Sequence, residues 1–180
     1  KVFLAYMAND SADRSHNIYA MMFDYATGQW TRSLVDVASY SGNDGHNAPS
    51  IYVAPSGHVE IFYGSLSAYV PLRLGPYYRV SGEPYSIASW GPRQNAPISM
   101  NNVIGGFTQD GSLHVLGSLH HARRAPNGVW SSSDLIKGTN GGALGTPGGI
   151  QHVLIHRSTI YFVWSPYNGS GAGRRLYFIK

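Results

Sequence analysis

Four short apolar segments of similar form recur along the chain, and this repetition constrains the possible folds more than any other feature. Matching Val2, Val59, Leu113 and Ile160 gives steps of 57, 54 and 47 residues. The segments read KVFLAY (1–6), HVEIFYG (58–64), SLHVLGS (112–118) and TIYFVWS (159–165). The period is close to the roughly 40 to 50 residues of a propeller blade. The repeat therefore predicts several copies of one supersecondary unit.

Turns and further strand-like runs surround the repeated segments. Ser56-Gly57 and Asp110-Gly111 precede two of the copies, and glycine suits hairpin turns because it readily adopts a positive φ. Polar loops and more strand material follow each copy, as in HHARRAPNGVW (120–130). No segment keeps a helical period of 3.6. We therefore predict an all-β fold, namely a β-propeller of four-stranded antiparallel blades with about four blades in this chain.

The predicted strands do not make up a whole number of blades. The chain begins in the second strand of one blade and ends near the third strand of the fourth, which gives about fourteen strands. Propellers typically close with about 4 to 8 complete blades. We expect residues 1–180 to form a single propeller domain that is part of a larger propeller. A small propeller closed irregularly, or an open arc whose edges pair with another chain, are the alternatives.

Composition excludes several classes of function. Only 12% of the residues are charged, against about 25% in an ordinary soluble domain. The net charge of +4 includes ten arginines, which suit an anionic ligand. Because the basic residues are scattered and no long apolar run exists, we expect neither nucleic-acid binding nor a membrane span. The absence of cysteine excludes disulfides and thiolate metal sites but does not identify the compartment. We favour a secreted or periplasmic location, and a cytosolic one stays open.

Blade topology predicts where chemistry would gather. Connections that enter the first strand of each blade open on the same face as those that join the second strand to the third. Residues 119–123 are expected to lie in one such connection. The predicted cleft is lined by polar and aromatic side chains from several connections, namely His46, Asn47, Tyr69, His120, His121, Arg123, His152 and Tyr167.

One segment carries a specific resemblance. NDGHNAPSIYVAPSGHVEIFYG (43–64) is similar to a segment of a subgroup of BNR-repeat propellers that includes ulvan-type polysaccharide lyases. In those lyases the histidine of the His-Asn pair lies in the active-site cleft, which implies the same place for His46. FDYATGQW (23–30) and RRAPNGVW (123–130) also resemble the Asp-box hairpins of sialidase-like propellers. That likeness implies packing roles for Trp30 and Trp130.

The resemblance implies a carbohydrate-active protein that cleaves an anionic, uronate-containing polysaccharide by β-elimination. This reaction needs a cation or hydrogen-bond donor for the carboxylate, a base for the α-proton and an acid for the leaving oxygen. His46 is the candidate base, Tyr69 or His120 the acid, and Arg123 the partner of the carboxylate. The remaining members of the predicted cleft would contact the substrate. No cofactor and no metal site are predicted, because adjacent strand residues such as His120 and His121 point to opposite faces.

Two alternatives stay open. Leu66, Met100-Asn101 and Ser118 stand where the lyase pattern has His, Tyr-Pro and Arg. These departures favour a non-catalytic carbohydrate-binding or protein-interaction module, in which His46 hydrogen-bonds a loop carbonyl and Asn47 caps a turn.

A sialidase-like glycoside hydrolase is the other alternative. It would need several arginines converging on one carboxylate, together with a tyrosine nucleophile. The available arginines form no recognisable pattern in the sequence, and most read as solvated surface residues; they are Arg73, Arg79, Arg93 and Arg123.

Overall fold

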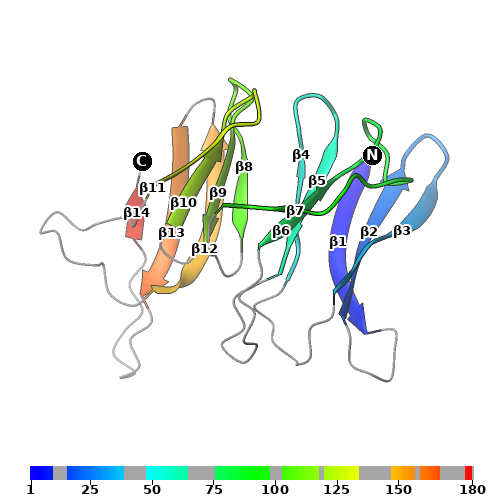
Figure 1. Ribbon diagram of the computed structural model, residues 1–180, viewed down its shortest axis with the longest axis horizontal. Coiled ribbons are helices and arrows are strands. Elements are labelled where there is room, and N and C mark those ends of the chain that lie inside the picture. Colours follow the sequence, from blue (N-terminus) through cyan, green and yellow to red (C-terminus); the bar gives the residue numbers. More distant parts are fainter. Residues whose placement is uncertain are drawn as a thin grey trace, which may run out of the picture. The chain divides into compact units, whose positions relative to one another are not determined.

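Strands make up the regular secondary structure of the described residues in this computed structural model (Figure 1). The structure describes residues 1–9, 16–38, 48–64, 76–97, 103–117, 120–133, 147–156, 159–166 and 177–179. The strands are β1 (Val2–Asn9), β2 (His16–Asp24), β3 (Gln29–Ala38), β4 (Ser50–Val53), β5 (Val59–Tyr63), β6 (Tyr77–Val80), β7 (Gln94–Asn95), β8 (Ile104–Phe107), β9 (Leu113–Gly117), β10 (His120–Arg124), β11 (Trp130–Ser133), β12 (Pro147–His156), β13 (Thr159–Pro166) and β14 (Tyr177–Ile179). Within these ranges, no helix is long and apolar enough to cross a membrane.

The strands form four antiparallel sheets in which each strand pairs with its neighbours in the chain. Strands β4–β7 and β8–β11 form four-stranded meanders, and β1–β3 and β12–β14 form three-stranded ones. The repeated segments become β1, β5, β9 and β13. The predictions of an all-β fold and of antiparallel meanders are confirmed. The sheets are compatible with propeller blades, and their closure around an axis stays a prediction.

Contacts divide the chain into two units, Lys1–Ala96 and Pro97–Lys180. We call them the N-terminal and the C-terminal unit and describe each by itself. The first contains β1–β7 and the second β8–β14. The expectation of a single domain stays a prediction.

The N-terminal unit packs its two sheets face to face (Figure 1). Ile18 and Ala20 on β2 are fully buried against Val59 and Ile61 on β5. These residues are two apart on each strand and therefore project from one face of each sheet. The buried core thus lies between β1–β3 and β4–β7.

A bulge in β3 changes the direction of one polar side chain. Tyr19 pairs with Leu34, whereas Ile18 pairs with Asp36, so Val35 is an extra residue in β3. A bulge shifts the alternation of the residues that follow it. Asp36 therefore shares the inward face with buried Ile18 rather than the outward face of Leu34, which is exposed.

The C-terminal unit packs β12 against β8. A Cβ added at Gly106 would lie 3.0 Å from Cδ1 of Ile155, so the Ile155 side chain packs directly on the backbone of Gly106. Gly106 pairs with His114 on β9, and directly paired residues project to the same side of a sheet. His114 is therefore on the face that β12 covers.

Three hairpin turns share one backbone pattern. In 54–58, 108–112 and 125–129, the fourth residue is a glycine that donates to the carbonyl of the first, at 2.8, 2.9 and 2.9 Å. Their φ values are 85° at Gly57, 80° at Gly111 and 85° at Gly128, where glycine is favoured over residues with a Cβ. The predicted hairpin turns at Gly57 and Gly111 are confirmed.

The Gly-x-Trp segments at 28–30 and 128–130 lie in two β-hairpins. If each sheet is a blade, these hairpins join its third strand to its fourth. They are the β2–β3 and β10–β11 hairpins. Trp30 contacts the ring of Phe23 with centroids 5.1 Å apart and is 49% exposed. Arg124 lies over Trp130 at 5.5 Å. Both tryptophans therefore contact neighbours within their own hairpin.

Candidate functional site

The structure describes only part of the cleft predicted from the sequence. His46, Asn47, Tyr69 and Tyr167 lie outside the described residues. His120 and His152 are placed as strand residues of β10 and β12. Described side chains in the predicted set belong to His121 and Arg123, so the gathering of all eight residues in one cleft stays a prediction.

One expectation needs correction at β10. Residues 119–123 were expected in a connection, whereas His120–Arg124 is a strand. Gly117 pairs with His120, so only two residues separate β9 from β10. Such a short connection lets the antiparallel pairing continue up to its ends. His121 and Arg123 therefore lie on the sheet surface, two residues apart and on one face.

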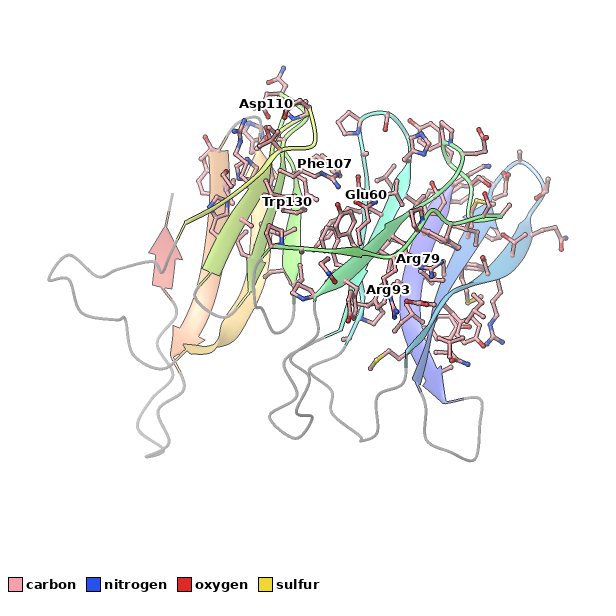
Figure 2. The ribbon with its side chains drawn as sticks, viewed as in Figure 1. Glu60, Arg79, Arg93, Phe107, Asp110 and Trp130 are labelled. Atoms are coloured by element: carbon pink, nitrogen blue, oxygen red, sulfur yellow. The ribbon has the colours of Figure 1, made fainter. Side chains whose placement is uncertain are left out.

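Charged side chains converge at the inward face of the N-terminal unit. Asp36 on β3 accepts a hydrogen bond of 2.6 Å from the Tyr63 hydroxyl. Oδ1 of Asp36 accepts a hydrogen bond of 3.2 Å from Nη2 of Arg79. Nη1 of Arg93 lies 3.4 Å from Oδ2, the oxygen to which Tyr63 donates. We call Asp36, Tyr63, Arg79 and Arg93 the Asp36 centre; Figure 2 shows its two arginines close together.

The Asp36 centre carries a surplus positive charge. Two guanidinium groups share one carboxylate, and arginine stays protonated in proteins. Within the described part of the chain, both arginines form ion pairs with Asp36 alone. The Asp36 side chain is 11% exposed, whereas that of Arg93 is 48% exposed. The surplus charge is therefore closest to solvent at Arg93.

Burial and Asp36 together change the chemistry of Tyr63. Burial raises the pKa of the Tyr63 phenol far above its usual range, and the hydrogen bond to Asp36 raises it further. The phenol therefore stays protonated and donates to the carboxylate. This role fixes Asp36 between the sheets and does not make Tyr63 a nucleophile.

The Asp36 centre is close in the chain to three residues predicted for the cleft. Tyr63 ends β5 and Tyr77 begins β6, with Tyr69 between them. Ser50, the first residue of β4, pairs with Phe62 next to Tyr63, and His46 and Asn47 lie four and three residues before it.

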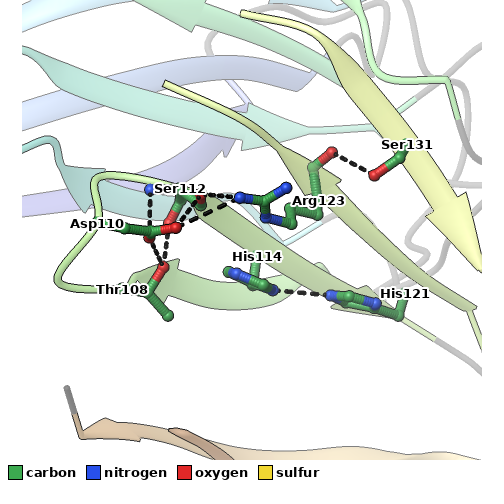
Figure 3. A network of polar contacts seen from close by, with 7 residues as sticks. All are labelled: Thr108, Asp110, Ser112, His114, His121, Arg123 and Ser131. Atoms are coloured by element: carbon green, nitrogen blue, oxygen red, sulfur yellow. Dashed lines mark hydrogen bonds and ion pairs between the residues drawn. The ribbon is translucent and has the colours of Figure 1, made fainter. Parts of the chain in front are cut away.

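The C-terminal unit holds a second polar network, drawn in Figure 3. Asp110 in the β8–β9 turn accepts hydrogen bonds from the Thr108 hydroxyl at 2.6 Å and the Ser112 hydroxyl at 2.9 Å. Nη2 of Arg123 lies 2.8 Å from Oγ of Ser112 and 3.3 Å from Oδ2 of Asp110. We call Thr108, Asp110, Ser112 and Arg123 the Asp110 centre.

Hydrogen bonds dominate the electrostatics of the Asp110 centre. The Thr108 hydroxyl lowers the pKa of Asp110 most, followed by the backbone N–H and hydroxyl of Ser112. One carboxylate meets one guanidinium, so the charges balance. The structure thus directs the Arg123 guanidinium toward a turn between a first and a second strand of a meander. Its predicted role as partner of a substrate carboxylate stays a prediction.

Two imidazoles pair on the same face of this sheet. Nδ1 of His114 lies 2.9 Å from Nε2 of His121, and the rings are stacked at 5.2 Å between centroids. Burial lowers the pKa of both, and the charge of Arg123 lowers each further. A neutral pair can hold one proton between the two nitrogens, with one ring as donor and the other as acceptor. The pair can therefore accept or relay a proton.

Several of these contacts were missed by the sequence analysis. His114 pairs with Arg123, and His121 with Leu116, across the connection at 118–119. Counting strand positions outward from that short connection would have placed His114 beside both predicted residues. Asp36 offered no comparable signal, because its inward direction depends on the bulge at Val35.

In the described ranges, no cluster of three or more His, Asp or Glu could hold a metal ion.

The fold of the chain is similar to that of two solved structures. One is described as a new family of polysaccharide lyase, PL25 ulvan lyase; the TM-score is 0.58 at 15% identity, covering 95% of this chain and 44% of that one. The other is described in the same words and as bound to -[GlcA(1-4)Rha3S]-, with a TM-score of 0.58 at 14% identity, covering 98% of this chain and 48% of that one. The chain therefore spans less than half the length of either structure.

At this level of identity the likeness concerns the fold. No protein-family model matches the sequence, and no curated protein matches it. The likeness to ulvan lyase that the segment 43–64 carries in the sequence thus has a counterpart in the fold, and the assignment to BNR-repeat propellers stays a prediction.

Proposed function

We propose that the protein binds an anionic, uronate-containing polysaccharide and cleaves it by β-elimination. The observation that carries this proposal is the fold likeness, over 98% of this chain, to a lyase structure bound to -[GlcA(1-4)Rha3S]-. The His-Asn pair at 46–47 and the surplus positive charge of the Asp36 centre support it. Arginine-rich sites suit carboxylate and sulfate groups.

In the proposed reaction, a base removes the proton on the carbon next to the uronate carboxylate. A double bond forms in the uronate ring as the bond to the glycosidic oxygen breaks, and an acid protonates that oxygen. His46 is the proposed base, and Tyr69 or His120 the proposed acid. Asn47, His121, Arg123, His152 and Tyr167 are the proposed substrate contacts. A positioned base typically contributes about 10² to 10⁴ in rate.

Absorbance of the unsaturated uronate in the ultraviolet tests the proposal directly. Incubation with ulvan should produce a steady rise with the wild-type protein. His46→Ala should reduce the rate at least about 100-fold, since it removes the base. His156→Ala is the matched control, because His156 is an exposed histidine of β12 that has no proposed role. It should keep the wild-type rate.

A non-catalytic binding module is the second candidate. The residues that favour it are Leu66, Met100-Asn101 and Ser118, where the lyase pattern has side chains that take part in the reaction. If the protein binds ulvan without any rise in absorbance, and His46→Ala binds equally well, the module is correct and elimination is not. Absence of both binding and absorbance would overturn the two candidates together.

A sialidase-like reaction has less support. Arg79 and Arg93 do converge on one carboxylate, but that carboxylate is Asp36 of the protein itself. The pKa of Tyr63 is raised by burial and by Asp36, which disfavours a phenolate nucleophile at this position.

A further inference from the structure

We propose that Arg93, stacked on Tyr77 and sharing Asp36 with Arg79, binds an acidic substituent of the glycan. The ligand group is a carboxylate or a sulfate ester. The proposal rests on the proposed function for the identity of the glycan, and on the described residues of the N-terminal unit for the binding group.

Within the described part of the chain, the contacts of Arg93 leave most of its N–H donors unused. Its Nη1 is 3.4 Å from Oδ2 of Asp36, which is long compared with the roughly 2.7 to 2.9 Å of a strong charge-assisted hydrogen bond. Tyr63 donates to the same oxygen at 2.6 Å and is its main partner. Guanidinium has five N–H donors, so Arg93 can bind a second anion without leaving Asp36.

The Tyr77 ring orients this guanidinium. The Arg93 Cζ lies 4.8 Å from the ring centroid of Tyr77, within the range of a cation–π contact. The planar guanidinium carries its N–H groups in a fork that matches two oxygens of a carboxylate or sulfate. Arg93 is therefore preorganised, and its 48% exposure leaves it accessible.

Arg79 supplies the charge that makes the second anion favourable. It is more buried than Arg93, at 25% exposure, and forms the shorter ion pair with Asp36. Its Nε is buried and has no hydrogen-bond partner among the residues that the structure describes. Because Arg79 already neutralises Asp36, the charge of Arg93 is uncompensated. An acidic group that reaches Arg93 would balance the charge of the centre.

The test is an NMR titration of the protein with the disaccharide GlcA(1-4)Rha3S. This probe has no sugar on the uronate O4, so elimination cannot consume it, and binding is read separately from turnover. Arg93→Gln should weaken binding about tenfold, as expected for loss of a charge-assisted contact. Arg93→Lys should retain part of the affinity, since it keeps the charge and loses the fork.

Two modified probes identify the acidic group. The partner is the sulfate if the wild-type protein binds the desulfated disaccharide about tenfold more weakly than the sulfated one, while Arg93→Gln binds the two disaccharides equally. The same pattern with the carboxyl-reduced disaccharide identifies the carboxylate. A merely structural role would weaken all three probes equally and leave the ratios unchanged, which would overturn the proposal.

The control is Arg32→Gln. Arg32 is also an exposed arginine stacked on a tyrosine, with Cζ 3.7 Å from the Tyr19 ring, but it lies on the outward face of β3. The Arg32→Gln variant should bind the disaccharide as tightly as the wild-type protein does. If Arg93→Gln binds as tightly as Arg32→Gln, the Arg93 site is wrong while the proposed function stands. If wild-type protein binds none of the probes, both fail.

Discussion

Each unit contains an aspartate that pairs with arginine and with hydroxyl groups, but the two centres differ in burial and in charge. Asp36 is 11% exposed and bridges two sheets. Asp110 is 53% exposed and stabilises its own turn. The first centre has two arginines for one carboxylate and the second has one. A balanced, local network is suited to holding a hairpin, whereas a buried carboxylate with a surplus arginine leaves a cation available for a ligand.

The largest expected effect is on stability at Asp36. Asp36→Asn would leave Arg79 and Arg93 without a counter-charge, and breaking a mostly buried ion pair is strongly destabilising. We expect a loss of about 3 kcal/mol in the free energy of unfolding, measured by urea denaturation. Asp110→Asn should shift the urea midpoint less, because that network is exposed. Equal shifts for the two variants would remove the contrast between the centres.

Turn glycines extend the comparison to the backbone. A Cβ at Gly57 would lie 2.5 Å from the Tyr85 ring, while a Cβ at Gly128 would meet nothing within 4 Å. Both residues have a positive φ, which costs alanine about 1 kcal/mol. We expect Gly128→Ala to lower the free energy of unfolding by about 1 kcal/mol. Gly57→Ala should lower it by about 2 kcal/mol, because Tyr85 must also be displaced. Thermal unfolding of the two variants side by side gives the measurement.

Acid should act on the Asp110 centre through its lowered pKa. The folded-state pKa of Asp110 lies below the usual value of 3.8, so its contribution to stability is fully present above that value. It is lost as the pH falls from there toward the folded-state pKa. The gap in urea midpoint between wild type and Asp110→Asn should therefore be constant near neutral pH and shrink below about pH 4. A gap that grows on acidification would mean that the network does not favour the carboxylate.

The smallest effect concerns the histidine pair. Arg123 lowers the pKa of His114 and His121 through its charge, in addition to the effect of burial. Arg123→Gln should therefore raise both pKa values, as followed by NMR titration of the imidazole protons. Arg124→Gln is the matched control, because Arg124 is the next residue of β10 and lies over Trp130. Unchanged titration in Arg123→Gln would separate the imidazoles from the Asp110 centre.

The strands were predictable because local patterns determine them. The repeated segments at Val2, Val59, Leu113 and Ile160 became β1, β5, β9 and β13, and glycine marked the hairpin turns. Alternation of side chains along a strand and short connections between strands suffice for this level of structure.

The Asp36 centre was not predictable by the same reasoning. Its other members lie 27 to 57 residues from Asp36 in the chain, and one extra residue in β3 turns Asp36 inward. Strict alternation would place Asp36 on the outward face with Arg32 and Leu34. Most of the group Arg73, Arg79, Arg93 and Arg123 were accordingly interpreted as solvated surface residues. A bulge has no reliable sequence signature, so a contact between sheets that depends on one escapes pattern analysis.

The chain-order pairing of the strands has a consequence for how the protein is made. Each strand hydrogen-bonds to strands adjacent in the chain, so a meander needs no segment that is synthesised much later. Domains fold as they emerge during translation, N-terminal parts first. The pairing of β4–β7 thus needs no strand of the C-terminal unit.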